Sequence, residues 1–112
     1  MSVALPRVEH MPSFRTQIEI LGLLPGHRPE EVLDTASASI GATHHVDERD
    51  LDVVAGTARI SVRFAVPDSS TWDEVADARE VADRCLADVA TVAVPGRHWL
   101  LGRSGTRWFP VE

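Results

Sequence analysis

Residues 58–64, ARISVRF, alternate strictly between apolar and polar side chains. This period of two is typical of a β-strand that buries one face, because neighbouring side chains on a strand point to opposite sides of the sheet. Ile60 and Phe64 would then face a core, while Arg59 and Arg63 would face solvent. The stretch decides the fold because the other strands and two helices can be placed on either side of it.

A second strand precedes this one across a tight turn. Gly56 supplies the turn, and upstream of it Leu51 and Val53 alternate with charged neighbours within residues 43–54. The two segments predict a β-hairpin joined near Gly56. Its first strand is strongly charged, which favours a position at the sheet edge, since charged edge strands discourage pairing between chains.

A strand and a helix come before the hairpin. Residues 14–20, FRTQIEI, alternate in the same way, and the pattern ends at the turn signal Pro25-Gly26. Pro29 suits the first position of a helix, and Gly41 is expected to close it in a left-handed conformation. Between these two residues, apolar side chains recur at helical spacing: Val32, Leu33, Ala36 and Ile40. A short amphipathic helix is therefore predicted.

A second helix follows the hairpin. Thr71 and Glu74 have the spacing of a capping box, so this helix is expected to begin at Trp72. It should end before Pro95-Gly96, a strong turn signal. Residues 91–94 fit either a last helical turn or an early strand, because β-branched residues favour strand while continuity favours helix.

The order strand, helix, strand, strand, helix, strand is that of the ferredoxin-like βαββαβ fold. The predicted class is α+β, a two-layer sandwich with an antiparallel sheet and two helices on one face. Right-handed crossovers give the strand order 4-1-3-2. Residues 97–111 predict a C-terminal hairpin that turns around Ser104-Gly105, so an extra strand extends the sheet beyond the fourth. A single domain is expected over residues 14–112, after an N-terminal extension at residues 1–13.

The composition is that of an ordinary globular protein, with 44% apolar and 25% charged residues over 112 positions. No apolar run is long enough to cross a membrane or to serve as a signal peptide, so the cytoplasm is the expected compartment. The single cysteine, Cys85, lies in a helical pattern and is expected to be a small buried side chain. All 11 basic residues are arginine, and lysine, asparagine and tyrosine are absent. Those three have AT-rich codons, so the bias indicates a GC-rich bacterial or phage genome.

His44, His45 and Asp47 form the most ligand-like cluster in the chain. Imidazole and carboxylate groups bind divalent metals, and alternate strand positions would aim His45 and Asp47 the same way. Adjacent histidines on a strand point to opposite faces, however, and the run lacks the glycine and the terminal glutamate of an EF-hand loop. The alternative is a solvated, charged strand, and no cofactor is expected.

A second candidate site is the loop of Gly26, His27 and Arg28, where free amide groups and the helix dipole favour an anion. The segment from Leu21 to Val46, about a quarter of the chain, resembles the ligand-binding half of ACT regulatory domains. That resemblance implies a small-molecule sensor. The glycine of that family lies at the helix start after Asp-Arg-Pro, whereas here Gly26 precedes the His-Arg-Pro sequence. The alternative is an ordinary strand-to-helix turn.

The third candidate is the C-terminal hairpin, where aromatic residues alternate with arginines. Its predicted interface residues are Arg97, Trp99, Arg103, Arg107, Trp108 and Phe109. Tryptophan and arginine are both enriched at protein interfaces. Nucleic acid would use the same residue types, but residues 58–64 lack the RNP1 pattern of glycines and aromatics, and a net charge of −6 repels a polyanion. A protein partner or a second copy is therefore expected.

No catalytic residues are predicted, since the chain has no GxSxG elbow and no tyrosine, and its only thiol is expected to be buried. The expected function is a non-enzymatic binding or assembly module, a homodimer or the partner of another protein, acting through the hairpin and a sheet edge. Opposite charges on the second helix and the C-terminus favour assembly. The alternatives are the small-molecule sensor at residues 26–28 and, less favoured, a metal-dependent enzyme that uses His44 and His45.

Overall fold

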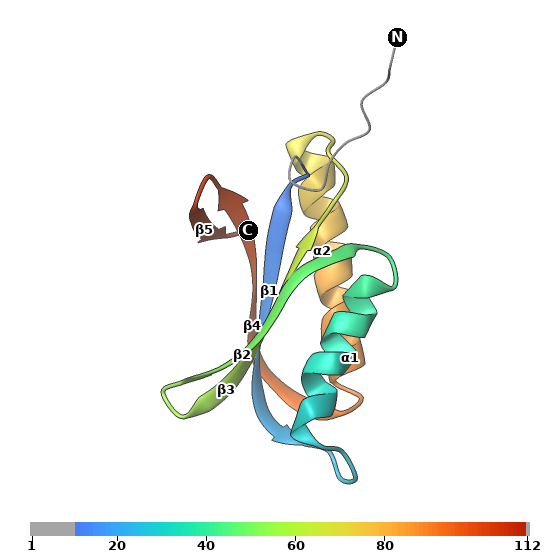
Figure 1. The fold of residues 1–112 in the computed structure, drawn as a ribbon, viewed down its shortest axis with the longest axis vertical. Coiled ribbons are helices and arrows are strands. Elements are labelled where there is room, and N and C mark those ends of the chain that lie inside the picture. The colour runs from blue at the N-terminus through green and yellow to red at the C-terminus, as the bar shows by residue number, and fades with distance from the viewer. Residues whose placement is uncertain (1–10, 112) are drawn as a thin grey trace.

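The computed structural model describes residues 11–111. Within that range the strands are β1 (Ser13–Leu23), β2 (His45–Val54), β3 (Thr57–Ala65), β4 (Ala93–Ser104) and β5 (Arg107–Pro110), and the helices are α1 (Pro29–Gly41) and α2 (Thr71–Val89). This order confirms the predicted α+β ferredoxin-like sandwich with an extra C-terminal strand (Figure 1). Of the predicted N-terminal extension, residues 1–10 lie outside the described range, and Ser13 already belongs to β1.

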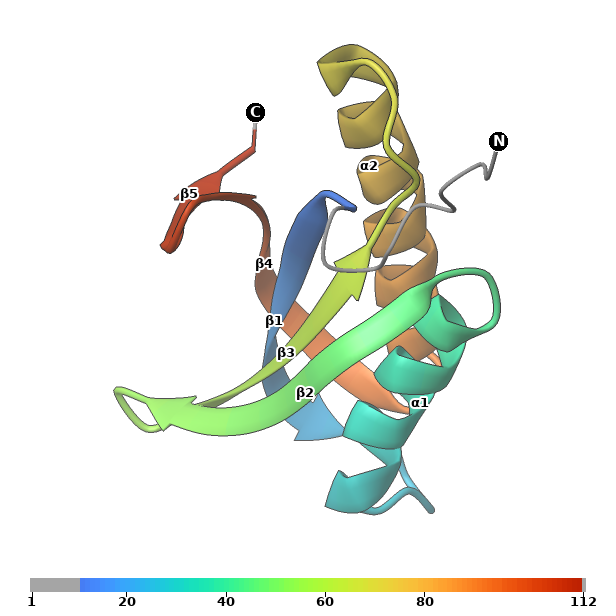
Figure 2. The same ribbon diagram turned by 45° about the horizontal axis from the view of Figure 1, so that its top comes forward.

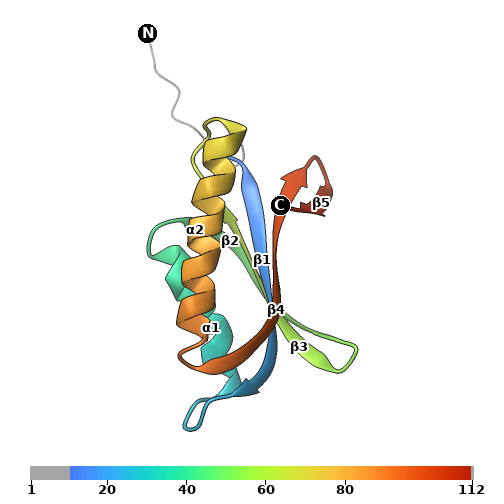
Figure 3. The same cartoon turned by 180° about the vertical axis from the view of Figure 1, so that it is seen from behind.

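The strands form one antiparallel sheet in the order β2-β3-β1-β4-β5. This is the predicted order, with the extra strand beyond β4 and the charged strand β2 at the opposite edge. Both helices cover the same face of the sheet (Figure 3). The other face has no covering layer within the described chain (Figure 2), and we call it the open face. Neither of the described helices is long and apolar enough to cross a membrane.

The core lies between the sheet and the helices. It is apolar because each strand turns every second side chain inwards and each helix adds one apolar stripe. Phe64 on β3 is fully buried and stacks on Phe14 of β1, with the ring centroids 6.2 Å apart. The other large side chains that are fully buried are Ile18, Ile40, Ile60, Val62, Val66, Val81, Cys85 and Val89. The predicted burial of the single thiol is therefore confirmed.

Three of the predicted turn glycines adopt a left-handed conformation, and Gly41 does not. Gly26 is at φ +84°, Gly56, at φ +81°, closes the β2–β3 hairpin, and Gly105, at φ +62°, closes the β4–β5 hairpin. Helix α1 does end at Gly41, followed by Ala42 at φ −63°. The prediction of a left-handed conformation at Gly41 is wrong, because the Ala42 amide still donates to the Ala38 carbonyl and the helical path continues past the glycine.

The N-terminus of α2 lies one residue earlier than predicted. Ser70 is the N-cap, and its hydroxyl oxygen accepts a hydrogen bond of 3.1 Å from the Asp73 amide. Glu74 reaches back to the Ser69 amide at 2.8 Å. The assignment of the cap to Thr71 is therefore wrong. Three hydroxyl residues, Ser69, Ser70 and Thr71, stand in a row here, and the sequence spacing alone favours the last of them.

Strand β4 begins before Pro95-Gly96, where the sequence predicted a break. Helix α2 ends at Val89 and β4 starts at Ala93, which resolves residues 91–94 into a turn followed by strand. Proline is tolerated because β5 pairs only with the far end of β4, which leaves this part of β4 at the sheet edge. Gly96 packs closely against β1, since a Cβ atom there would lie 3.0 Å from the Leu21 side chain and would push it aside by a few tenths of an ångström.

Candidate functional site

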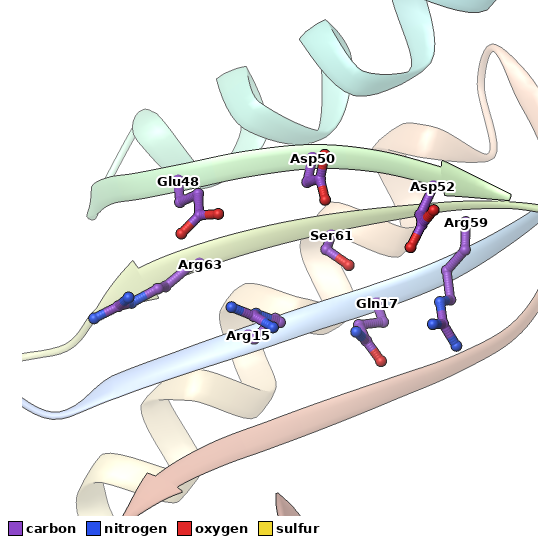
Figure 4. Close-up of a pocket in the computed structure, with 8 residues that line it drawn as sticks. All are labelled: Arg15, Gln17, Glu48, Asp50, Asp52, Arg59, Ser61 and Arg63. Carbon is purple, nitrogen blue, oxygen red and sulfur yellow. The ribbon is translucent and has the colours of Figure 1, made fainter. Parts of the chain in front are cut away.

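The open face carries the polar side chains of the alternating strands. Figure 4 shows its centre, a shallow hollow of about 220 Å³ over β1, β2 and β3. The side chains that line it are Arg15, Gln17, Glu48, Asp50, Asp52, Arg59, Ser61 and Arg63. Alternation places them there: on β1 and β3 the intervening side chains are mostly buried against the helices, and the residues of β2 pair with β3 in register.

Three guanidinium groups surround the indole ring of Trp108 on β5. Arg15 of β1 lies 4.5 Å from the ring centroid, Arg63 of β3 lies 5.5 Å from it, and Arg103 of β4 lies 5.9 Å from it. A cation within about 6 Å of an indole is attracted by the negative face of the ring. The contacts gather positive charge from three strands at one place on the open face.

Trp99 on β4 forms a second, smaller cluster. The guanidinium groups of Arg97 and Arg59 lie 5.4 Å and 5.8 Å from its ring centroid. Arg97 also binds both carboxylate oxygens of Glu19, at 3.0 Å and 3.2 Å. These hydrogen bonds hold the pKa of the Glu19 carboxyl below its usual value. Arg97 is therefore neutralised within the chain.

The negative charge of the open face lies along β2. Glu48 is directly opposite Arg63 in the strand register, and Asp52 is directly opposite Arg59. Cross-strand neighbours of opposite charge commonly pair. Here neither pair comes within 4.0 Å, and Figure 4 shows both guanidinium groups turned away from the carboxylates. Carboxylates thus lie over one edge of the sheet, while the guanidinium groups gather at the indoles of β4 and β5.

This separation leaves charges without partners on both halves of the open face. Within residues 11–111, three of its arginines have no carboxylate oxygen within 4.0 Å: Arg15, Arg59 and Arg103. Three of its acids have no arginine nitrogen within that distance: Glu48, Asp50 and Asp52. Arg63 is intermediate, because its Nε is buried without a hydrogen bond and lies 3.9 Å from Asp47.

The structure divides the predicted interface residues between two faces. Arg97, Trp99, Arg103 and Trp108 belong to the two clusters on the open face. Phe109 alternates to the other side, where it is 46% exposed and lines an apolar groove beside α2. Arg107 shares that side by the same alternation. The role of all six in an interface stays a prediction.

Sequence reasoning missed the larger part of the open face. Arg15, Arg59 and Arg63 were assigned to the solvent side of their strands but not to a site, and the acids of β2 were interpreted as solvated. The available signal was the predicted strand order, which places residues 14–20 between residues 58–64 and the C-terminal hairpin. Combining that order with the alternation would have brought these arginines beside the tryptophans.

The loop of Gly26, His27 and Arg28 already holds an anion from its own helix. Glu31 accepts a hydrogen bond of 3.3 Å from the Arg28 amide, and its other carboxylate oxygen lies 2.8 Å from Nδ1 of His27. The bond to His27 is the main cause that lowers the pKa of the Glu31 carboxyl. The side chain thus occupies the position that an external carboxylate or phosphate would take.

The two adjacent histidines point apart. His44 packs edge-on against Phe64, and its Nε2 lies 3.0 Å from Asp77 on α2. His45 is on the outside, where its Nε2 lies 3.1 Å from Asp47. Within the described residues no group of three or more histidine, cysteine, aspartate or glutamate side chains is arranged to hold a metal ion.

The His44 contacts belong to a network that ties the α1–β2 loop to α2. Thr43 lies 2.8 Å from Nδ1 of His44 and accepts a hydrogen bond from Arg84. Cys85, on the same helix, is not an available nucleophile, because burial raises the pKa of its thiol to about 12. The contacts of Thr43, His44 and Cys85 are therefore explained by the packing of the α1–β2 loop and α2, without a substrate.

Comparison with known proteins gives no relative for this chain: no family model, no curated protein and no solved structure matches it. The open face is therefore the feature from which a function is inferred. Its distinctive property is the separation of three carboxylates on β2 from three guanidinium groups around two indoles, all without a partner of opposite charge within 4.0 Å among residues 11–111.

Proposed function

We propose that this protein is a non-enzymatic binding module whose open face binds an acidic protein surface through the arginines around Trp99 and Trp108. One observation carries the proposal. Arg15, Arg59 and Arg103 have no carboxylate within 4.0 Å among the described residues, although they lie on a face that also bears acids. Arginines that are held in place without a carboxylate partner can bind an anionic surface without first breaking an ion pair.

The contacts between the arginines and the two tryptophans favour the binding of an acidic surface. A guanidinium group is planar, weakly hydrated and able to bind a carboxylate with two parallel hydrogen bonds. Contact with an indole restricts its motion before binding, so less conformational entropy is lost when a partner arrives. Arginine and tryptophan are also the residue types that most often dominate the binding energy of protein interfaces.

A protein partner is favoured over nucleic acid for two reasons. First, Glu48, Asp50 and Asp52 lie on the same face, and the chain has a net charge of −6, so a long polyanion meets repulsion as well as attraction. Second, binding of single strands relies on free aromatic faces that stack on bases. Here a guanidinium group already lies 4.5 Å from the centre of the Trp108 ring.

The small-molecule alternative has weaker support. Its loop is filled by the Glu31 carboxylate, which would have to be displaced from His27 and from the Arg28 amide. The metal-dependent enzyme has weaker support too, since His44 contacts Asp77 on α2 whereas His45 contacts Asp47 on the outside of the molecule. We therefore place the binding function on the open face.

The test is titration with soluble poly-glutamate, followed by tryptophan fluorescence at low ionic strength. The double variant R15E/R59E should bind at least about tenfold more weakly than the parent chain, because it reverses two of the unpaired cations. The matched control R28E/R79E reverses two exposed arginines that lie off the open face and should bind like the parent chain.

Two results would overturn the proposal. The first is no poly-glutamate binding by the parent chain, and the second is equal weakening in both double variants. Tighter binding to oligothymidine than to poly-glutamate at about 150 mM salt would contradict the choice of a protein partner. Far-ultraviolet circular dichroism of each variant checks that the fold is kept.

A further inference from the structure

We infer that the acidic surface bound by the open face is that of a second copy of this chain, packed open face to open face about a two-fold axis parallel to the strands. The inference rests on the proposed function and names its partner. It commits to an isologous dimer, in which each copy offers the same surface and the acids of one meet the arginines of the other.

Among residues 11–111, the unpaired acids and the unpaired arginines of the open face are equal in number. Glu48, Asp50 and Asp52 follow one another along β2 at one edge of the sheet. The three unpaired guanidinium groups lie toward the other edge, beside Trp99 on β4 and Trp108 on β5. Within one copy they stay apart, so each charge is available to a partner of opposite sign.

The direction of the axis follows from this pattern. When two sheets face each other, a two-fold axis along the strands turns the β2 edge of one copy over the β4–β5 edge of the other. Acids then oppose arginines at both ends of the interface. An axis across the strands would instead place β2 over β2 and the indole clusters over each other. Like charges would meet everywhere, which costs binding energy and excludes that arrangement.

The face also has the apolar anchors and the size that a weak dimer needs. Trp99, Leu101 and Trp108 share it, because cross-strand partners lie on the same side of a sheet. Four strands about 4.8 Å apart and about 30 Å long, with the four-residue β5 beside them, offer roughly 600 Å² in each copy. Two such faces bury about 1,200 Å², the lower end of the range for specific interfaces. We therefore expect a dimer at tens of micromolar rather than a permanent one.

The inference is tested by reversing the charges of each half of the open face in a separate variant and then mixing the two variants. One variant, E48R/D50R/D52R, makes the whole open face basic, and the other, R15E/R59E/R103E, makes its indole half acidic. Sedimentation velocity at about 50 micromolar should show a dimer for the parent chain and a monomer for each variant alone. An equimolar mixture of the two variants should restore a dimer that contains one copy of each.

The control keeps the charge change but moves it off the open face. D68R/E80R/D83R reverses three exposed acids on α2 and the loop before it and should dimerise like the parent chain. If a reversal variant fails to fold, the isosteric set E48Q/D50N/D52N replaces it. Its dimer dissociation constant should rise at least about tenfold, since the carboxylate charges are lost without a change of shape.

The outcomes separate this inference from the proposed function. A parent chain that stays monomeric but still binds poly-glutamate through Arg15 and Arg59 overturns the dimer alone. A parent dimer that survives both reversals, or a mixture that stays monomeric, also overturns the face-to-face arrangement. A parent chain that neither dimerises nor binds poly-glutamate overturns both proposals together.

Discussion

At the scale of single residues, the most unusual feature is the convergence of three like charges on one indole. Arg15, Arg63 and Arg103 all lie within 5.9 Å of the Trp108 ring centroid, and the nearest described carboxylate is that of Asp47, 3.9 Å from Arg63. Attraction to the ring is worth only about 1 kcal/mol for each exposed cation, so it offsets the mutual repulsion incompletely. Carboxylates of a binding partner would offset the remaining repulsion between the guanidinium groups, which is why the cluster favours an interface.

Arg97 shows the contrasting case of a guanidinium group whose partner lies within the chain. Its hydrogen bonds lower the pKa of Glu19 from the usual 4.5. A carboxyl with a lowered pKa in the folded state stabilises the fold above its unfolded pKa, and the contribution disappears as the pH falls through the folded pKa. Glu19→Gln mimics the protonated form and should therefore be less stable than the parent chain at pH 7, and the difference should be smaller at about pH 3, where more of the carboxyl is protonated.

Urea unfolding at the two pH values checks this expectation. Glu80→Gln is the control for the loss of one exposed carboxylate, because Glu80 has no arginine within 4.0 Å among the described residues. A Glu19→Gln effect of equal size at both pH values would show that the Arg97 pair does not contribute to stability.

At the scale of elements, the sequence pattern predicted what alternation and helical spacing determine, and it failed where local packing decides. Strands β1 and β3 and both helices follow from their periods. The start of β4 did not, because Pro95-Gly96 normally ends an element, whereas here residues 93–95 already pair with β1. That pairing involves residues far away in the sequence and leaves no local signal.

The cap of α2 gives a direct test at this scale. Ser70→Ala should lower the free energy of unfolding by about 1 kcal/mol, because the hydroxyl that accepts from the Asp73 amide is lost. Thr71→Ala should change it by less than about 0.5 kcal/mol, since Thr71 is the first helical residue and alanine is a good helix former. Urea unfolding of the two variants measures both. A larger decrease in the free energy of unfolding for Thr71→Ala than for Ser70→Ala would show that Thr71, the residue predicted from the sequence, is the N-cap.

At the scale of the whole molecule, two kinds of uncovered surface compete to explain association. One is the charged open face. The other is an apolar strip where the β2–β3 hairpin extends past α1 (Figure 2), with Leu51 53% exposed and Val53 67% exposed. The sequence showed that Leu51 and Val53 alternate with charged residues but did not show that α1 is too short to cover them. It also did not show that Arg59 reaches from β3 across β1 to Trp99, since side-chain conformation decides that contact.

Salt distinguishes these two surfaces. Pairing through the open face should weaken as sodium chloride rises from about 20 mM to 500 mM, because the Debye length falls from about 20 Å to about 4 Å. We expect the dimer dissociation constant to increase at least about tenfold over that range. Association through the apolar strip would instead strengthen in ammonium sulfate, which favours burial of apolar surface. The variant L51S/V53S should keep the salt-weakened dimer of the parent chain. If it is monomeric and the parent dimer tightens with sulfate, the second copy binds the apolar strip, and the charge separation on the open face needs another partner.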